Sequence, residues 1–276
     1  MTLNTKQLNT VIGPNMQEFF NNVKIIKKPK SKSVVIFQCD EDFFNNYGIY
    51  NLASCEKNNL DVHIHFINPK EEFLDRIDKF NTCINFSYSV EEINTNINFY
   101  KLKSYYFCSR YFITDHLFNN NLIEDAFITD ADIIFNDCIS IPKETKLGIL
   151  YYPHHNNLWK QTGANISYVH KEKHSFLKTV IEIYKQKLDN TDFDIISENM
   201  DKFEKANLYA LDQVCMSLAL QQGFIDSKFL NLASLDKFIG KNKNTKIWSL
   251  TGGGQKGNPN LKKMLDAILL TKYKYD

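Results

Sequence analysis

Two aspartates interrupt an otherwise mostly apolar stretch near the middle of the chain. In "EDAFITDADIIFND", residues 124–137, Asp130 and Asp132 separate the segment 126–129 from the segment 133–135. Two carboxylates one residue apart point the same way in extended backbone, because the side-chain period of a strand is two. Together they could bind one hard cation such as Mg²⁺ or Mn²⁺, and such ions commonly carry substrate phosphates. The alternative is a solvated turn with an N-capping aspartate, but a charged pair inside core-like sequence needs a compensating partner, which a metal supplies.

Strands alternate with helices on both sides of this aspartate pair. The apolar and periodic patterns predict strands at 33–40, 62–67, 126–129, 147–152 and 164–169, and helices at 43–59, 69–80, 104–118, 171–188 and 208–223. This order predicts an α/β fold with a mainly parallel central sheet flanked by helices. In such a sheet, ligands collect at the carboxyl ends of the strands, which is where the aspartate pair falls.

The chain divides into three predicted parts. Residues 1–32 are polar and form an N-terminal arm, and residues 33–260 form a single domain. Residues 261–276 form a C-terminal helix with one apolar stripe. We expect this stripe to pack on the body of the protein. The alternative is peripheral docking on an anionic membrane that presents a lipid-linked acceptor.

Composition excludes several classes of protein. The net charge of +1 provides no cationic field for nucleic acid, so no nucleic-acid partner is expected. The six cysteines contain no C-x-x-C pair, which favours reduced thiols in a cytoplasmic protein over a disulfide framework or a zinc site. No apolar run reaches the roughly 18 residues that a transmembrane helix requires, and the first ten residues lack the apolar core of a signal peptide.

A glycine cluster near the end of the domain is a candidate phosphate-binding loop. Three of the ten glycines are consecutive at 252–254, and Lys256 follows them. Backbone amides of such a loop can approach a diphosphate closely, with the lysine as a point charge. The alternative is a turn between a strand and the final helix.

Two pairs of histidines admit a structural and a functional interpretation. His154 and His155 could reach a ligand from the end of the strand 147–152, but we interpret them as part of a surface loop. His63 and His65 alternate with apolar residues in the strand 62–67, so we interpret them as an exposed strand face.

Several of these segments resemble the GT-A fold glycosyltransferases of family eight, which include bacterial galactosyl- and glucosyltransferases and glycogenin. "FITDADIIFND" is similar to the D-x-D segment of that family, and further segments match in the same order between residue 33 and about residue 260. These are "FQCDEDFF" at the first strand, Arg110 in the helix before the D-x-D strand, "QTGANISYV", and "YALDQVCMSLAL".

The resemblance implies a role for each matching residue. Mn²⁺ or Mg²⁺ would be bound by Asp130 and Asp132, and the nucleotide base and ribose would be contacted by Gln38, Asp40 and Asp42. The donor would be contacted by Arg110, and its diphosphate would be covered by Gly253, Gly254 and Lys256. The sugar pocket would be lined by Gln161, Thr162 and Gly163, with Asp212 and Gln213 beside the reacting sugar. There are two departures. The family's third metal ligand is a histidine in an H-x-x-G-x-x-K segment, but "IWSLTGGGQKGN" contains no histidine, and Gln161 stands where the family has asparagine.

The implied function is that of a hexosyltransferase, which moves a sugar from a nucleotide-sugar, expected to be a UDP-sugar, to an acceptor hydroxyl with retention of configuration. The acceptor could be a glycan, a lipid-linked molecule or a protein. Two alternatives stay open. One is a metal-dependent phosphatase of the D-x-D-x-T type, although that motif usually follows the first strand and Ile134 stands where threonine or valine is expected. The other is a non-catalytic nucleotide- or glycan-binding relative, which the missing histidine favours.

Overall fold

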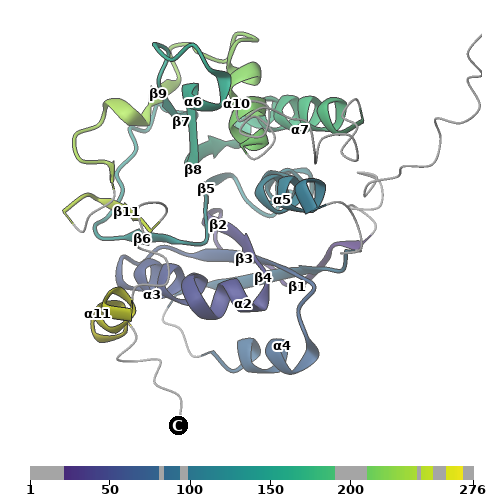
Figure 1. The fold of residues 1–276 in the computed structure, drawn as a ribbon, viewed down its shortest axis with the longest axis vertical. Coiled ribbons are helices and arrows are strands. Elements are labelled where there is room, and N and C mark those ends of the chain that lie inside the picture. The colour runs from purple at the N-terminus through teal and green to yellow at the C-terminus, as the bar shows by residue number, and fades with distance from the viewer. Residues whose placement is uncertain are drawn as a thin grey trace, which may run out of the picture.

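A large mixed sheet forms the centre of the molecule (Figure 1). The computed structural model describes residues 22–80, 84–93, 99–189, 210–240, 244–250 and 259–269. Among these residues the main sheet has eight strands in the order β1-β4-β3-β2-β5-β8-β7-β9, and a second sheet has three strands in the order β10-β11-β6. The strands are β1 (Lys24–Lys27), β2 (Ser33–Cys39), β3 (Val62–Ile67), β4 (Phe86–Glu91), β5 (Asp125–Thr129), β6 (Ile133–Phe135), β7 (Leu147–Tyr151), β8 (Thr162–His170), β9 (Phe229–Asn231), β10 (Ile239–Gly240) and β11 (Ile247–Ser249).

Strand direction in the main sheet confirms the predicted, mainly parallel architecture. β4, β3, β2 and β5 pair in parallel, and so do β7 and β9. β8 runs antiparallel to both of its neighbours, β5 and β7, so its first residues lie beside the carboxyl end of β5. β1 is an antiparallel edge strand on β4. The segment 1–32, predicted as an arm, therefore contributes a strand of the sheet through its described part.

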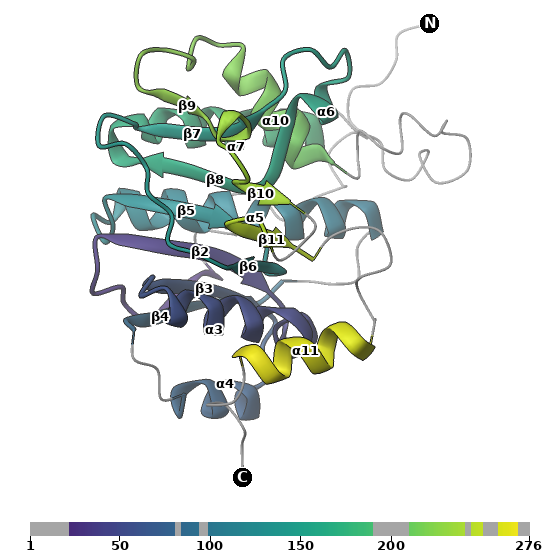
Figure 2. The same ribbon diagram turned by 90° about the vertical axis from the view of Figure 1, so that its left-hand side faces the viewer.

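Helices cover both faces of this sheet (Figures 1 and 2). The helical elements are α2 (Glu41–Phe43), η1 (Phe44–Gly48), α3 (Ile49–Lys57), α4 (Glu71–Asp78), α5 (Phe99–Asn119), α6 (Leu158–Gln161), η2 (Lys171–Lys173), α7 (His174–Asp189), α10 (Leu211–Leu220), η3 (Leu232–Ser234) and α11 (Pro259–Leu269). One buried core joins the sheet to α5, α7 and α10, and a second joins the opposite face to α3, α4 and α11. This alternation of strands and covering helices confirms the predicted α/β class.

The helix predicted over 43–59 is interrupted by a π-helical turn at Phe44–Gly48. Phe44 is buried edge-on against Phe66 and Phe73, with ring centroids 5.4 and 5.6 Å away. A Cβ atom on Gly48 would lie only 2.8 Å from the Phe44 ring. Glycine is therefore required where this ring packs on the turn.

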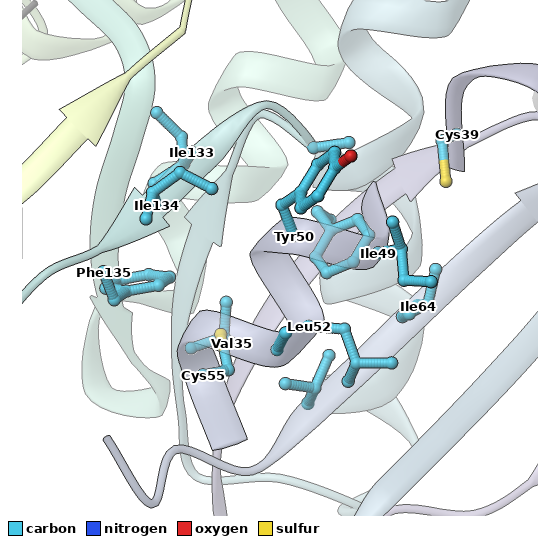
Figure 3. Close-up of a cluster of buried hydrophobic side chains, with 14 of the residues drawn as sticks. Val35, Cys39, Ile49, Tyr50, Leu52, Cys55, Ile64, Ile133, Ile134 and Phe135 are labelled. Carbon is cyan, nitrogen blue, oxygen red and sulfur yellow. The ribbon is translucent and has the colours of Figure 1, made fainter. Parts of the chain in front are cut away.

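The short strand β6 is fixed by a buried cluster against α3 (Figure 3). Its three residues, Ile133–Phe135, are all buried, and the Phe135 amide donates to the Ser54 hydroxyl of α3 at 3.0 Å. Figure 3 shows Leu52 and Cys55 of α3 close to Val35 of β2 in the same cluster. The residues between β5 and β6 are thereby held at both ends by core packing.

The C-terminal helix packs on the body of the protein, as expected. In α11, Leu265 is buried in the same core as α3, and Asp266 accepts a hydrogen bond from the Tyr50 hydroxyl at 2.7 Å. The helix begins at Pro259, two residues before the predicted start. No helix in the described part of the chain is long and apolar enough to cross a membrane.

The interpretation of His63 and His65 as an exposed strand face is wrong. Both imidazoles are fully buried between β3 and α5, because central strands of a sheet covered by helices are buried on both faces. His63 contacts the hydroxyls of Ser87 and Ser89 at 2.9 and 3.0 Å, and His65 contacts Ser89 at 2.9 Å and Glu91 at 3.2 Å. Polar partners in register on β4 therefore compensate for the burial of these side chains.

Candidate active site

The aspartate pair lies in a turn between β5 and β6. Residues 130–132 leave the extended conformation after Thr129, so the strand-period argument for a common direction of the two side chains does not apply. Hydrogen bonds hold the turn on several sides. The Asp130 amide donates to the Asn165 carbonyl at 3.0 Å, the Asn51 side chain donates to the Asp130 carbonyl at 3.1 Å, and the Leu250 amide donates to the Asp132 carbonyl at 3.0 Å. Asp132 is buried and Asp130 is half-buried.

Arg110 links this turn to the start of α10. Its side chain is only 1% exposed and extends from α5. Nη1 donates to Oδ1 of Asp130, and Nη2 donates to Oδ2 of Asp212 at 2.7 Å. Nη2 also donates to the Ala164 carbonyl of β8 at 3.1 Å. One guanidinium therefore holds two carboxylates from two distant segments in fixed positions, as a planar fork of donors can.

The charges of these three residues depend on one another. Burial alone would lower the pKa of Arg110, but Asp130, and further Asp212, raise it well above the ordinary value. Burial raises the pKa of Asp212 to about 6, Arg110 opposes that rise, and Asp130 adds to it. Asp212 is in the first turn of α10, where the helix dipole favours a negative charge, and it accepts a hydrogen bond from the Gln213 amide at 2.8 Å. Near neutral pH the carboxylate of Asp212 is therefore held ionised in a buried position.

The predicted sugar-pocket residues lie at the start of β8, next to α10. Thr162 donates to the Gln213 carbonyl at 2.9 Å, and its hydroxyl lies 3.2 Å from that of Ser217. Gln161 ends α6 and donates to the His155 carbonyl at 2.9 Å. Gly163 is half-buried, and a Cβ atom there would lie 3.0 Å from Leu150. The structure thus places Thr162 beside Gln213.

The predicted nucleotide-contacting residues take three different positions around the end of β2. Asp40 caps α2, accepting a hydrogen bond from the Phe43 amide at 2.7 Å, and Asp42 is exposed in the first turn. Gln38 faces α5 and donates to the Tyr106 carbonyl, because side chains of a strand alternate between the two faces of the sheet. Asp40 and Asp42 are therefore at the carboxyl edge, whereas the Gln38 side chain is engaged with the helix layer.

The remaining predicted residues, Gly253, Gly254 and Lys256, lie outside the described residues.

The loop that carries His154 and His155 follows β7, at the edge of the sheet that also carries Asp130, and His154 is exposed. This agrees with its interpretation as a surface loop.

The Asp130 carboxylate has the capacity to bind a hard divalent cation. Asp130 already accepts one hydrogen bond at each oxygen, from Arg110 and from the Asn165 side chain at 3.2 Å. A carboxylate has about four acceptor positions, so both oxygens keep the capacity to bind a metal. In the part of the chain that the structure describes, no group of three or more His, Cys, Asp or Glu residues is arranged to hold a metal ion. A cation held by Asp130 and Asp132 would therefore take oxygen ligands from phosphate and water for its other positions.

Asn165 is a site residue that the sequence did not indicate. Its side chain donates to Oδ2 of Asp130 at 3.2 Å and to the Ser249 hydroxyl at 3.4 Å, and its carbonyl accepts from the Asp130 amide. An uncharged side chain in a strand has no spacing signature of its own. The available signal was a lone asparagine between the apolar residues Ala164 and Ile166.

Comparisons with known proteins establish the fold. No protein-family model and no curated protein matches the chain in sequence. The structure is similar to a crystal structure of the glycosyltransferase GlyE of Streptococcus pneumoniae TIGR4, with a TM-score of 0.50, 13% identity, and coverage of 85% of this chain and 60% of that chain. The similarity to the apo form of GlyE has a TM-score of 0.55, 12% identity, and coverage of 88% of this chain and 63% of that chain. The chain has the same overall fold as these GlyE structures. It spans less than two thirds of the length of these neighbours.

Proposed function

We propose that this protein is a hexosyltransferase that moves a sugar from a nucleotide-sugar, in our view a UDP-sugar, to an acceptor hydroxyl with retention of configuration. In the transfer, the anomeric carbon forms a bond to the acceptor oxygen and its bond to the diphosphate breaks. The electron pair of that bond leaves on the nucleoside diphosphate, and the hydroxyl proton passes to a phosphate oxygen or to water. The fold shared with GlyE supports glycosyl transfer in general.

One observation carries the proposal. Arg110 brings Asp130 and Asp212 together, although these residues come from a turn after β5 and from the start of α10. Asp130 lies where ligands collect in open α/β sheets, beyond the carboxyl end of a parallel strand, and Arg110 holds Asp212 beside it. Burying a cation and two carboxylates costs desolvation free energy, and well-packed apolar side chains in the same place often stabilise a fold as much. Stability alone therefore does not explain the arrangement. The arrangement is explained more simply as a preorganised charged site.

The residues of this chain divide the work of the reaction. Asp130 and Asp132 would hold a Mn²⁺ or Mg²⁺ ion, which when bound neutralises charge that develops on the diphosphate. Glycosyl transfer also develops positive charge on the sugar ring, and the Asp212 carboxylate would stabilise that charge from its fixed position. Arg110 keeps Asp212 ionised and oriented, and Gln213 shapes the sugar pocket against Thr162.

A nucleotide-sugar binding and turnover assay tests the proposal. Thermal unfolding is measured with UDP-, GDP- and ADP-sugars, each with and without Mn²⁺, because a ligand that binds only the folded state raises stability by mass action. Nucleoside diphosphate release is then measured for the stabilising donor. We expect Asp132→Asn to remove the metal-dependent part of donor stabilisation. Asp137→Asn, an exposed carboxylate just past β6, is the matched control and should behave as wild type.

Three results would contradict the proposal. Wild-type turnover by both Asp130→Asn and Asp132→Asn would show that the carboxylates are structural. Donor binding without transfer or hydrolysis would identify a non-catalytic relative. Phosphate release from a simple phosphoester such as p-nitrophenyl phosphate, in the absence of any effect of nucleotide-sugars, would instead select the phosphatase.

A further inference from the structure

Three aromatic rings gather in the loop that follows β7. The ring centroids of His154 and His155 are 4.4 Å apart, and the Tyr152 ring lies 6.4 and 6.2 Å from them. We call Tyr152, His154 and His155 the ring cluster. Tyr152 also packs against one of the two buried cores, so the cluster has a fixed base. Its geometry combines flat apolar surface with polar ring atoms.

The polar atoms of the ring cluster are available to a ligand. Among the described residues, no hydrogen bond or ion pair reaches the side chain of Tyr152, His154 or His155. His154 is exposed, and the other two rings are half-buried. Four residues after His155, in α6, the indole N–H of Trp159 is buried and has no acceptor within the described ranges. The three rings therefore leave their polar atoms open to a bound molecule, and the buried indole N–H is a group for which an acceptor is expected.

Hydrogen bonds connect the ring cluster to the candidate active site. The Tyr152 amide donates to the Gln161 carbonyl at 2.7 Å, and the Gln161 side chain donates to the His155 carbonyl at 2.9 Å. Beside Gln161, the Thr162 hydroxyl donates to the Gln213 carbonyl at 2.9 Å. The residue after Asp212 therefore contacts Thr162, whose neighbour Gln161 is hydrogen-bonded to the ring cluster. Figure 2 shows α6 beside α10 at one end of the main sheet.

Strand order places the ring cluster on the far side of the aspartate turn from the nucleotide-contacting residues. β5 lies between β2, which leads to Asp40, and the pair β8 and β7, which leads to Tyr152. If the base binds beside Asp40 and the diphosphate at the turn, the transferred sugar lies near Asp212. A molecule that attacks this sugar then approaches from the side of β7.

We propose that the ring cluster is the acceptor subsite and that the acceptor is a carbohydrate, whose terminal ring stacks on it. The inference rests on the proposed function and names its acceptor class. A pyranose ring has apolar C–H faces and a hydroxyl edge, which match aromatic faces that carry polar atoms. A lipid tail would leave the polar ring atoms unpaired. An extended peptide would pair through its backbone with a free strand edge, but β7 is bordered by β8 and β9.

Ligand-observed saturation-transfer NMR tests the subsite without requiring turnover. The probes are a set of methyl hexopyranosides and methyl N-acetylhexosaminides, each added to the protein in the presence of UDP and Mn²⁺. We expect at least one glycoside to receive saturation, most strongly at its ring C–H protons. The double variant His154→Ala/His155→Ala should weaken binding of that glycoside about fivefold to tenfold, and Tyr152→Phe, which keeps the ring, should weaken it less.

The matched control is His170→Ala. This histidine ends β8 at the opposite edge of the sheet and contacts Lys146 and Glu172. The His170→Ala variant should bind the glycoside as tightly as wild type does. Saturation of UDP serves as the control that each variant is folded. Saturation of UDP without saturation of any glycoside, or equal glycoside binding by wild type and the double variant, would overturn the subsite and leave the proposed function standing. Absence of UDP binding to the wild type would overturn both.

Discussion

Nη2 of Arg110 lies 2.7 Å from Oδ2 of Asp212, although 102 positions separate the two residues in the chain. The contact joins α5 to the first turn of α10 across the start of β8, whose Ala164 carbonyl accepts from the same nitrogen. A second donor of the guanidinium holds Asp130. The charge balance of the candidate active site therefore depends on a single side chain.

Replacing Arg110 should strongly destabilise the protein. Arg110→Met leaves two carboxylates without their cation in a buried site, and removal of one partner from a buried ion pair costs about 3–5 kcal/mol. We expect a loss of this size in the free energy of unfolding, measured by urea denaturation. Arg110→Met/Asp212→Asn should recover part of it, because one uncompensated charge is removed. Arg76→Met, which breaks an exposed pair with Glu41, should change stability by about 1 kcal/mol or less. A loss no greater than that of this control would contradict the prediction.

Asp212 should give stability a distinct dependence on pH. Folding raises its pKa from 3.8 to about 6, so between these values the native state binds a proton that the unfolded state has lost. The contribution of this carboxyl to stability is therefore most favourable below pH 4 and decreases as the pH rises through 6, by about 3 kcal/mol in all. Asp212→Asn cannot titrate, so its stability relative to wild type should increase from pH 4 to pH 7. Urea unfolding at several pH values measures this difference, and a constant difference would show that Asp212 ionises freely in the fold.

The order of strands and helices could be predicted from local patterns. The burial of each strand face and the partner of each strand could not. Apolar runs such as 33–40 and 62–67 form strands because their burial is encoded in the side chains themselves. The alternation of His63 and His65 with apolar residues is typical of a half-exposed strand. The serines that compensate for their burial are on β4, in register with them, and one segment cannot reveal its partner. The antiparallel direction of β8 is unpredictable from local pattern for the same reason.

The candidate site was predictable where charged residues matched a family pattern in order. Arg110, Asp130 and Asp212 were singled out in this way, and the structure brings them together; their catalytic roles remain predictions. Asn165 was missed because its contribution comes from a backbone approach between β5 and β8, which leaves no mark on residue type. Gln38 was predicted to contact the ligand because of its place in a motif. In the structure it contacts Tyr106 instead, because its side chain is on the face of β2 that α5 covers.

His63 should make the protein sensitive to acid. Burial, with the nearby charges of His65 and His116, lowers its pKa from 6.5 to about 3, so it stays neutral in the fold while the unfolded chain binds a proton. Stability should therefore fall as the pH decreases from 6.5, with a contribution of about 3 kcal/mol by pH 4. His63→Gln keeps polar atoms but does not titrate, so its stability relative to wild type should increase toward pH 4. His170→Gln, near the surface, is the control. Parallel pH profiles of His63→Gln and wild type would show that this imidazole does not resist protonation.

Asp40 has two separable roles, a helix cap in the structure and a proposed contact with the nucleotide. Its side chain accepts from the Phe43 amide at 2.7 Å, and asparagine caps helices about as well as aspartate does. Asp40→Asn should therefore change the free energy of unfolding by only a few tenths of a kcal/mol, whereas Asp40→Ala should lower it by about 1 kcal/mol.

Binding of UDP then distinguishes the two roles. An asparagine cannot accept from the base N–H and the ribose hydroxyls as a carboxylate does, and a lost charge-assisted hydrogen bond costs about 1.5–3 kcal/mol. We expect Asp40→Asn to weaken UDP binding about tenfold or more in calorimetric titration and to reduce the preference for UDP over GDP and ADP. Asp42→Asn, at an exposed position in the same turn, is the control. It measures how much UDP binding weakens when one negative charge near the site is lost without the Asp40 contact being changed. If Asp40→Asn binds UDP as tightly as wild type while Asp40→Ala loses stability, Asp40 acts only as a helix cap and the base contacts another residue.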